Sequence, residues 1–302
     1  MITIGEALRT SARRLERVGI EEYRVESEYL VAAALQIPRT HLILQQNRSL
    51  HAKARAALRR WTAERAKRKP LAYVLGDQPF MGLELSVNSA VLIPRPETEL
   101  LVEQAIKILE NPPSPPLQKG GEGGFLIVDV GTGSGNIAIS LAQHIPQAQV
   151  IGIDLSPAAL RLARINARKN DVAHRCRWRR GDLLRPLLSK AGRAQMVIAN
   201  LPYVKTHEIE SLEPELQWEP RLALDGGPDG LKLIFRLIDQ AREVLSVNGV
   251  LLLEIAPDQA KKLNRRLESD TAWTKCQVFK DLAGLPRIVE VHRKDIHGHP
   301  DH

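Results

Sequence analysis

The apolar positions of the first part of the chain follow helical spacing. One series ends at a glycine and consists of Ile4, Leu8, Leu15 and Val18, followed by Gly19. A second series runs over residues 23–35, and a third follows Leu50, Ala54, Leu58 and Trp61. Side chains three or four positions apart share one side of a helix, so each series can bury one face. A small all-helical N-terminal domain is therefore predicted over residues 1–72.

The pattern changes to alternation after this helical part. Leu83, Leu85 and Val87 alternate with polar residues, which is typical of a strand with one buried side. We expect a β-hairpin linker over residues 73–93, bridging the helical domain and the rest of the chain. The segment 94–97 then leads into a further helix.

Strands and helices alternate from Phe125 onwards. Continuous apolar runs predict four buried strands, at 125–130, 150–154, 196–199 and 250–255. Runs of this kind are typical of parallel strands covered on both faces. Ser156 and Pro157 signal a helix start after the second strand, and another helix is expected at about 230–245. The alternation predicts an α/β domain with a doubly wound, mostly parallel sheet over residues 94–292.

Two segments lack the pattern of folded structure. Residues 110–124 are dominated by proline and glycine, which favours an extended or disordered backbone without enough apolar surface to order itself. We expect a disordered surface insertion with no part in the chemistry. The tail over 293–302 is expected to be frayed, and the histidines of the C-terminal stretch are not expected to bind a metal.

The cysteine content and the lack of long apolar runs indicate the cellular compartment in which the protein is expected. The chain has 302 residues and only two cysteines, Cys176 and Cys276, which favours a reducing environment without a disulfide framework. The N-terminus has no signal-peptide pattern, and no apolar run approaches the roughly 20 residues that span a bilayer. A soluble, cytoplasmic protein without a membrane partner is expected.

The formal net charge of +8 is concentrated in two runs. Residues 53–69 hold eight lysines and arginines against the single acid Glu64, and residues 175–185 hold five arginines. Such runs favour anionic partners, including RNA or an acidic protein. A solvated helix face explains each run equally well, so charge alone does not decide the substrate.

A glycine-rich loop follows the first predicted strand of the sheet. It consists of Gly131, Thr132, Gly133, Ser134 and Gly135. Asp154 ends the second strand, where a carboxylate can accept both hydroxyls of a ribose. A nicotinamide cofactor would need a third glycine at position 136, and this chain has Asn136. We therefore predict S-adenosylmethionine, with Asp182 placed to meet the adenine amine; the loop taken alone could be no more than a tight turn.

The tetrapeptide Asn200, Leu201, Pro202 and Tyr203 follows the strand 196–199. An amide or aromatic amine is a poor nucleophile because its nitrogen lone pair is delocalised. The side-chain oxygen of Asn200 and the backbone carbonyl of Leu201 can accept its two hydrogens and orient the lone pair. Pro202 fixes that carbonyl by restricting the preceding residue, and Tyr203 can pack against a planar substrate. The pattern predicts methyl transfer to nitrogen, with alignment and desolvation as the main contributions.

The chain resembles the PrmC/HemK family of protein-(glutamine-N5) methyltransferases, which modify peptide chain release factors. The similarity is most specific at 92–99 and 219–227 and covers nearly the whole chain, except the insertion and the tail. It implies a seven-stranded class I methyltransferase domain and an N-terminal domain that docks the release factor. It also implies that Asn200 to Tyr203 grip the glutamine of a Gly-Gly-Gln loop, and that Gly131 to Gly135, Asp154, Leu183 and Asn200 line the cofactor. A monomer without direct nucleic-acid binding is expected.

One residue departs from the family pattern and leaves alternatives open. The family usually has proline where this chain has Leu201, so the carbonyl survives but Asn200 gains freedom. The same tetrapeptide resembles that of ribosomal RNA adenine dimethyltransferases, which makes an RNA adenine-N6 enzyme the alternative. The motifs at 92–99 and 219–227 stand against it, because those RNA enzymes lack them. A catalytically silent adaptor is disfavoured by the intact cofactor residues.

Overall fold

The computed structural model describes residues 2–111, 124–190 and 192–295. Most of the predicted insertion, 112–123, and the end of the predicted tail, 296–302, lie outside the described residues. The described chain forms two compact units. Unit 1 comprises Met1–Asp77 with Leu212–Trp218, and unit 2 comprises Gln78–Ser211 with Glu219–His302. The return of Leu212–Trp218 to unit 1 is absent from the predicted domain ranges, because no hydrophobic period marks it.

Unit 1 is helical, as the apolar spacing predicts. Its α-helices are α1 (Ile4–Glu16), α2 (Tyr23–Leu35), α3 (Ala52–Arg65) and α4 (Leu71–Leu75). A capping box begins α1: the Thr3 hydroxyl accepts the Glu6 N–H at 3.2 Å, and the Glu6 carboxylate accepts the Thr3 N–H at 2.9 Å. The predicted apolar series converge on one core that includes Ile4, Leu15, Leu30 and Leu58.

Unit 2 contains a seven-stranded sheet in the order β5-β4-β3-β6-β7-β9-β8. The strands are β3 (Phe125–Val130), β4 (Ala148–Asp154), β5 (Cys176–Arg180), β6 (Ala194–Ala199), β7 (Leu245–Glu254), β8 (Gln277–Lys280) and β9 (Pro286–His292). The strands β3 to β7 run parallel, whereas β9 is antiparallel to both β7 and β8. The chain proceeds from β3 outwards to β4 and β5, then returns to the other side of β3 with β6. Ligands bind at such a switch point in doubly wound sheets.

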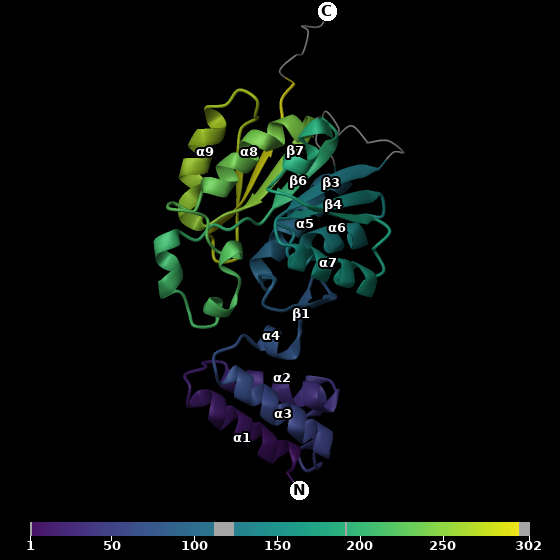
Figure 1. Cartoon of the computed structure of the whole chain (residues 1–302), viewed down its shortest axis with the longest axis vertical. Helices are drawn as coiled ribbons and strands as arrows, with labels where there is room; N and C mark the ends of the chain where they lie inside the picture. Colours follow the sequence, from purple (N-terminus) through teal and green to yellow (C-terminus); the bar gives the residue numbers. More distant parts are fainter. Residues whose placement is uncertain (1, 112–123, 191, 296–302) are drawn as a thin grey trace, which may run out of the picture. The chain divides into compact units, whose positions relative to one another are not determined.

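Helices cover both faces of this sheet (Figure 1). On one face lie α5 (Pro96–Glu110), α6 (Asn136–His144) and α7 (Pro157–Lys169), and on the other lie α8 (Lys232–Val244) and α9 (Ala260–Glu268). Neighbouring strand residues enter different cores: Ile127 packs with residues of α6, and Val128 packs with residues of α8. Both faces of β3 are therefore apolar, which explains its unbroken hydrophobic run. The predicted cap is confirmed, since Ser156 Oγ accepts the Ala159 N–H at 3.2 Å.

The predicted hairpin is formed by β1 (Asp77–Phe80) and β2 (Leu83–Ser86). It packs into the sheet core, because Phe80 and Leu85 are buried beside the apolar face of α5. The preceding residues 71–75, which the prediction divided between the helical domain and the linker, form α4 instead.

The two basic runs have different structures. Residues 176–180 form the edge strand β5, in which Arg177 and Arg179 are exposed while Cys176 is buried. The interpretation of this run as a solvated helix face is therefore wrong, because its charges alternate with a strand period and protect a sheet edge. The other run lies largely on α3, where Arg59 and Arg60 are exposed but Arg65 is buried. In the part of the chain that the structure describes, no helix is long and apolar enough to span a membrane.

Candidate active site

A cavity of about 440 Å³ opens at the carboxyl ends of β3, β4 and β6 in unit 2. Ten of the predicted site residues line it: Gly131, Thr132, Gly133, Ser134, Asp154, Asp182, Leu183, Asn200, Leu201 and Pro202. Gly135 and Tyr203 are not among its described lining residues. Gly135 precedes α6 with φ of +83°, and a Cβ there would lie 2.9 Å from Ile139 Cδ1. Its place is thus one of close packing beneath the loop.

Asp154 ties the end of β4 to the glycine-rich loop. Its Oδ2 accepts the Gly133 N–H at 2.9 Å, and its Oδ1 accepts the Ser156 N–H at 2.8 Å. Burial raises the pKa of this carboxyl, and the backbone N–H groups of Ser156, Gly133 and Leu155 oppose the rise. Each carboxylate oxygen can accept a second hydrogen bond, so hydroxyl groups of a ribose in the cavity can be held here.

Buried polar atoms beneath and beside the loop also fit a polar ligand. Asp129 is completely buried, and its Oδ2 accepts from Thr132 Oγ1 at 2.5 Å and from the Ala138 N–H at 3.2 Å. Burial raises the pKa of Asp129 to about 7. Ser134 Oγ is buried without a hydrogen-bond partner in the described structure, and Ser134 lines the cavity.

Asp182 lies in the cavity wall, but its carboxylate is already paired. Arg236 Nη2 lies 2.6 Å from Asp182 Oδ2, and Arg185 Nε lies 3.6 Å from the same oxygen. Arg236 itself lines the cavity. This pairing cannot be read from the sequence, since Arg236 belongs to the amphipathic helix α8 and follows Asp182 by 54 residues.

Asn200 belongs to a chain of side-chain hydrogen bonds that leads into the protein. Asn200 Nδ2 donates to Thr98 Oγ1 at 3.0 Å, and Thr98 Oγ1 donates to Glu254 Oε2 at 2.7 Å. Tyr203 Oη donates to the other oxygen, Glu254 Oε1, at 3.4 Å. Burial raises the pKa of Glu254 to about 7, and burial together with Glu254 raises the pKa of Tyr203 to about 12. Tyr203 therefore carries its proton at neutral pH.

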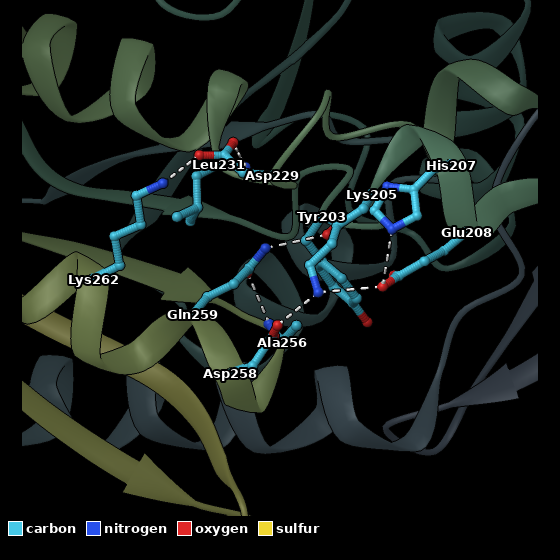
Figure 2. A network of polar contacts seen from close by, with 10 residues as sticks. All are labelled: Tyr203, Lys205, His207, Glu208, Asp229, Leu231, Ala256, Asp258, Gln259 and Lys262. Atoms are coloured by element: carbon cyan, nitrogen blue, oxygen red, sulfur yellow. Dashed lines mark hydrogen bonds and ion pairs between the residues drawn. The ribbon is translucent and has the colours of Figure 1, made fainter.

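The backbone after the tetrapeptide is held by the start of α9 (Figure 2). Gln259 Nε2 donates to the Tyr203 carbonyl at 3.1 Å, and Gln259 Oε1 accepts the Ala256 N–H at 3.0 Å. Lys205 Nζ bridges Glu208 at 3.2 Å and Asp258 at 2.9 Å. These contacts fix the exit of the tetrapeptide, whose carbonyl direction matters to the predicted chemistry.

Glycines of the segment 226–230 pack on the same backbone. A Cβ at Gly226 would lie 2.6 Å from the Pro202 carbonyl oxygen, and one at Gly230 would lie 2.2 Å from that of Tyr203. Both distances are below any normal contact, so these positions require glycine. The Val204 N–H donates to the Leu224 carbonyl at 3.0 Å, and the Gly226 N–H donates to the Val204 carbonyl at 2.8 Å.

The two segments that carry the family resemblance meet at the cavity. Arg95 forms an ion pair with the buried Glu219, whose Oε2 also accepts the Ile93 N–H at 3.2 Å. Burial raises the pKa of Glu219, against the opposing effect of Arg95. Pro94 and Pro220, next to this pair, line the cavity. The pairing was not anticipated from the sequence, because each motif also holds other acidic residues that could pair with Arg95.

Three side chains around the tetrapeptide were not singled out from the sequence: Thr98, Glu254 and Gln259. Glu254 offered a signal, because a carboxylate that ends an otherwise apolar strand is costly to bury without a purpose. Thr98 lay inside a recognised motif, and only the fold brings it to Asn200. Among the described residues no cluster of three or more histidine, cysteine or acidic side chains is arranged to hold a metal ion.

Comparison with protein families gives two matches. Residues 6–76 match the family described as PrmC N-terminal domain, and residues 127–217 match the family described as Methyltransferase domain. A release factor glutamine methyltransferase of Moorella thermoacetica is 38% identical over 296 residues, covering 97% of this chain and 100% of its own. The relative of the same name in Geobacter sulfurreducens is 36% identical, with 95% of each chain covered.

Among solved structures, the hMettl16 catalytic domain, crystallised in complex with a 3′UTR hairpin, superposes with a TM-score of 0.54. It is 12% identical in sequence, and the match covers 82% of this chain and 84% of that one. Together with the matched methyltransferase domain and the strand order, this likeness identifies the fold of unit 2 as that of class I methyltransferases.

Proposed function

Because the chain belongs to the release factor glutamine methyltransferase family, we propose that it methylates the glutamine side chain in the Gly-Gly-Gln loop of a peptide chain release factor. The methyl donor is S-adenosylmethionine, and the reaction supports translation termination. The observation that carries this conclusion is the similarity to relatives of that name, 33–38% identical over 95–97% of this chain. Methylation of ribosomal RNA adenine, the alternative from the tetrapeptide, is not favoured, because those relatives are named for a protein substrate.

The cavity fits the cofactor. We propose that Asp154 accepts the ribose hydroxyls with the acceptor capacity that the Gly133 and Ser156 N–H groups leave free. We assign the loop residues Gly131 to Ser134 and Leu183 to the same ligand, and Gly135 to support of the loop from beneath. Asp182 is assigned to the adenine amine only through the oxygen that Arg236 leaves free, since Arg236 contacts Oδ2. When bound, S-adenosylmethionine supplies an electrophilic methyl group.

The tetrapeptide accounts for selection of an amide nitrogen. Asn200 turns its Nδ2 to Thr98, so its Oδ1 remains to accept one N–H of the substrate amide. The Leu201 carbonyl accepts the other, and both bonds draw electron density towards the nitrogen. Together they hold the amide with its lone pair directed at the methyl group, which contributes alignment rather than proton transfer. Neither acceptor needs to remove a proton before attack.

For Tyr203, we propose a supporting role in addition to the predicted packing against the planar substrate. Its hydroxyl donates to buried Glu254, and its ring packs against the sheet core. We assign it to holding the tetrapeptide and to one side of the substrate's path. Pro202 lines the cavity and remains the residue that restricts Leu201.

Unit 1 supplies the docking surface for the release factor in this proposal. The match to the PrmC N-terminal domain covers residues 6–76, nearly all of the first part of unit 1. Its exposed cations on α3, Arg59 and Arg60, face solvent and can attract an acidic surface. We further propose that the protein acts as a monomer and does not bind nucleic acid directly.

One experiment tests the activity. The purified protein is incubated with cofactor carrying a labelled methyl group and with one of three acceptors: a release factor, the same factor with the loop glutamine changed to alanine, and ribosomal RNA. We expect label in the first acceptor alone. Equal labelling of the alanine variant would move the acceptor elsewhere, and labelling of RNA without the factor would restore the alternative.

A further inference from the structure

The hydrogen-bond chain behind Asn200 joins three segments that are distant in sequence. Thr98 lies in the first turn of α5, Glu254 ends β7, and Asn200 follows β6. The strands β6 and β7 are parallel neighbours, with Ala199 opposite Leu253, so their carboxyl ends bring Asn200 and Glu254 together. Thr98 and Glu254 are each only 1% exposed. Such a buried arrangement is costly unless each polar group is satisfied, and here each one is.

We infer that Thr98 and Glu254 are positioning residues that determine which end of the Asn200 amide faces the substrate. An ionised carboxylate only accepts hydrogen bonds, so the single hydroxyl proton of Thr98 points to Glu254. The Thr98 oxygen is then left with lone pairs and can only accept from its other neighbour. The amide end that donates is Nδ2, and Oδ1 is consequently turned away from Thr98.

Reversing the direction of these hydrogen bonds would turn the N–H donors of Asn200, instead of its Oδ1, towards the substrate. A protonated Glu254 can donate to Thr98 Oγ1, which frees the threonine proton to point at Asn200. The amide would then place Oδ1 against Thr98 and turn its two N–H donors to the cavity. Donors there oppose the N–H groups of a substrate amide. This inference rests on the proposed role of Asn200 as an acceptor, and it makes acceptance of the Thr98 proton by residue 254 the condition for full turnover.

The surroundings of Glu254 place this condition near physiological pH. Burial is the largest influence and raises the pKa to about 7; the hydrogen bonds from Thr98 and Tyr203 oppose it. Arg287 of β9 lowers the pKa, and Glu97 of α5 raises it. Arg287, Glu97 and Tyr203 are thus the charged and titratable groups that act on Glu254 in the described structure.

Two substitutions at Thr98 separate the effect of its hydrogen bonds on Asn200 from the effect of its packing. Thr98→Val keeps the shape but removes the hydroxyl, so Asn200 can turn either way; Thr98→Ser keeps the hydroxyl. We expect Thr98→Val to lower kcat about 5- to 10-fold, which is roughly the effect of one hydrogen bond. The KM for the release factor should change much less, and Thr98→Ser should restore most of the loss. Calorimetric titration with the cofactor serves as the folding control for both variants.

A pH profile supplies the second test. Wild-type kcat should fall as pH drops through about 7, the pKa of Glu254, because protonation permits the reversed chain. Glu254→Gln cannot ionise but can still accept from Thr98, so it should keep part of the activity and lose this acidic fall. An unchanged acidic fall in Glu254→Gln, or wild-type kcat in Thr98→Val, would overturn the inference.

The outcomes also separate this inference from the proposed function. If the wild-type protein transfers no label to a release factor, the function itself fails. If wild type is active and Asn200→Ala is equally active, the role of Asn200 fails. If Asn200→Ala is inactive while Thr98→Val and Thr98→Ser both match wild type, the positioning role alone is refuted.

Discussion

Arg65 and Glu215 form an ion pair inside unit 1, with 2.9 Å between Nη1 and Oε1. The Arg65 side chain is 5% exposed and also holds Glu26, at 2.6 Å between Nε and Oε2. Glu215 also forms an ion pair with Arg68, with 2.7 Å between Oε2 and Nη2. The pair joins α3 to the segment Leu212–Trp218, which follows closely after the tetrapeptide in the chain. The segment Leu212–Trp218 is therefore part of the helical unit, although the chain directly before and after it belongs to the methyltransferase unit.

Glu215→Gln should destabilise unit 1. The change removes the negative charge from two arginines, one of them buried, while the side chain keeps its size. We expect a loss of about 1.5–3 kcal/mol, the usual range for hydrogen bonds to charged groups. Urea unfolding followed by circular dichroism measures it. Glu213→Gln, at an exposed position of the same segment, is the matched control and should unfold like the wild type.

Reversing the exposed charges of α3 should weaken capture of the release factor. Arg65 and Arg68 are unsuitable for this test, because their ion pairs stabilise unit 1. Arg59→Glu with Arg60→Glu should raise the KM for the release factor, most strongly at low salt, and leave the cofactor affinity unchanged. Arg13→Glu with Arg14→Glu makes the same change of charge on α1, where both residues are exposed. Equal effects of the two double variants would mean that only net charge matters.

Asp154→Ala should weaken cofactor binding. It removes an acceptor for the ribose and also frees the Gly133 N–H that Asp154 holds at 2.9 Å. The expected loss is about 1.5–3 kcal/mol, or roughly 10- to 150-fold in Kd. Isothermal titration calorimetry gives the value directly. Gln149→Ala, at an exposed position of the same strand, should bind normally, and an unchanged Kd in Asp154→Ala would refute the ribose contact.

Asn200→Ala should nearly abolish turnover. Loss of one aligned acceptor of this kind costs about 2.7–4 kcal/mol in the barrier, or roughly 10²- to 10³-fold in kcat. Cofactor affinity should change much less, because the ribose is held elsewhere. Single-turnover methylation of a release-factor domain that carries the Gly-Gly-Gln loop measures the rate. Wild-type turnover by the variant would remove this side chain from the mechanism.

Leu201→Pro should keep turnover at or above the wild-type value. Residue 201 retains its carbonyl, and proline restricts the backbone of Asn200. Stability should fall by about 1–2 kcal/mol, since Leu201 is buried in the sheet core. Leu201→Ala loses the same packing without the restriction, so its turnover should be lower than that of Leu201→Pro. If the alanine variant is the faster of the two, rigidity at this position does not assist the reaction.

Repeating hydrophobic patterns predicted much of the fold. The helices α1 and α2, the buried strands β3 and β6, and the cap at Ser156 all have local causes in spacing or capping chemistry. The edge strand β5 was missed because arginines dominate it and only Cys176 and Trp178 mark its less exposed side. The antiparallel strands β8 and β9 were expected only through the family resemblance, since their sequences carry a weaker period.

The site was predictable where its residues follow strand ends. Asp154 and Asn200 come directly at or after buried strands, and topology brings such ends together. Thr98 could not be found in this way, because its partner lies on β7, and their contact depends on how α5 packs on the sheet. Asp182 shows the opposite case: its position was predictable, whereas its pairing with Arg236 depends on the packing of α8.

The return of Leu212–Trp218 to the helical unit determines how this protein can be divided. The chain passes from one unit to the other after Asp77, after Ser211 and after Trp218. A single proteolytic cut therefore cannot release both units intact. A cut after Asp77, for example, separates the helical unit from its own segment Leu212–Trp218. A fragment that stops at Asp77 lacks Glu215, so Arg65 keeps Glu26 but loses half of its charge compensation. Any transplant of the helical unit therefore has to carry 212–218 along with the residues up to Asp77.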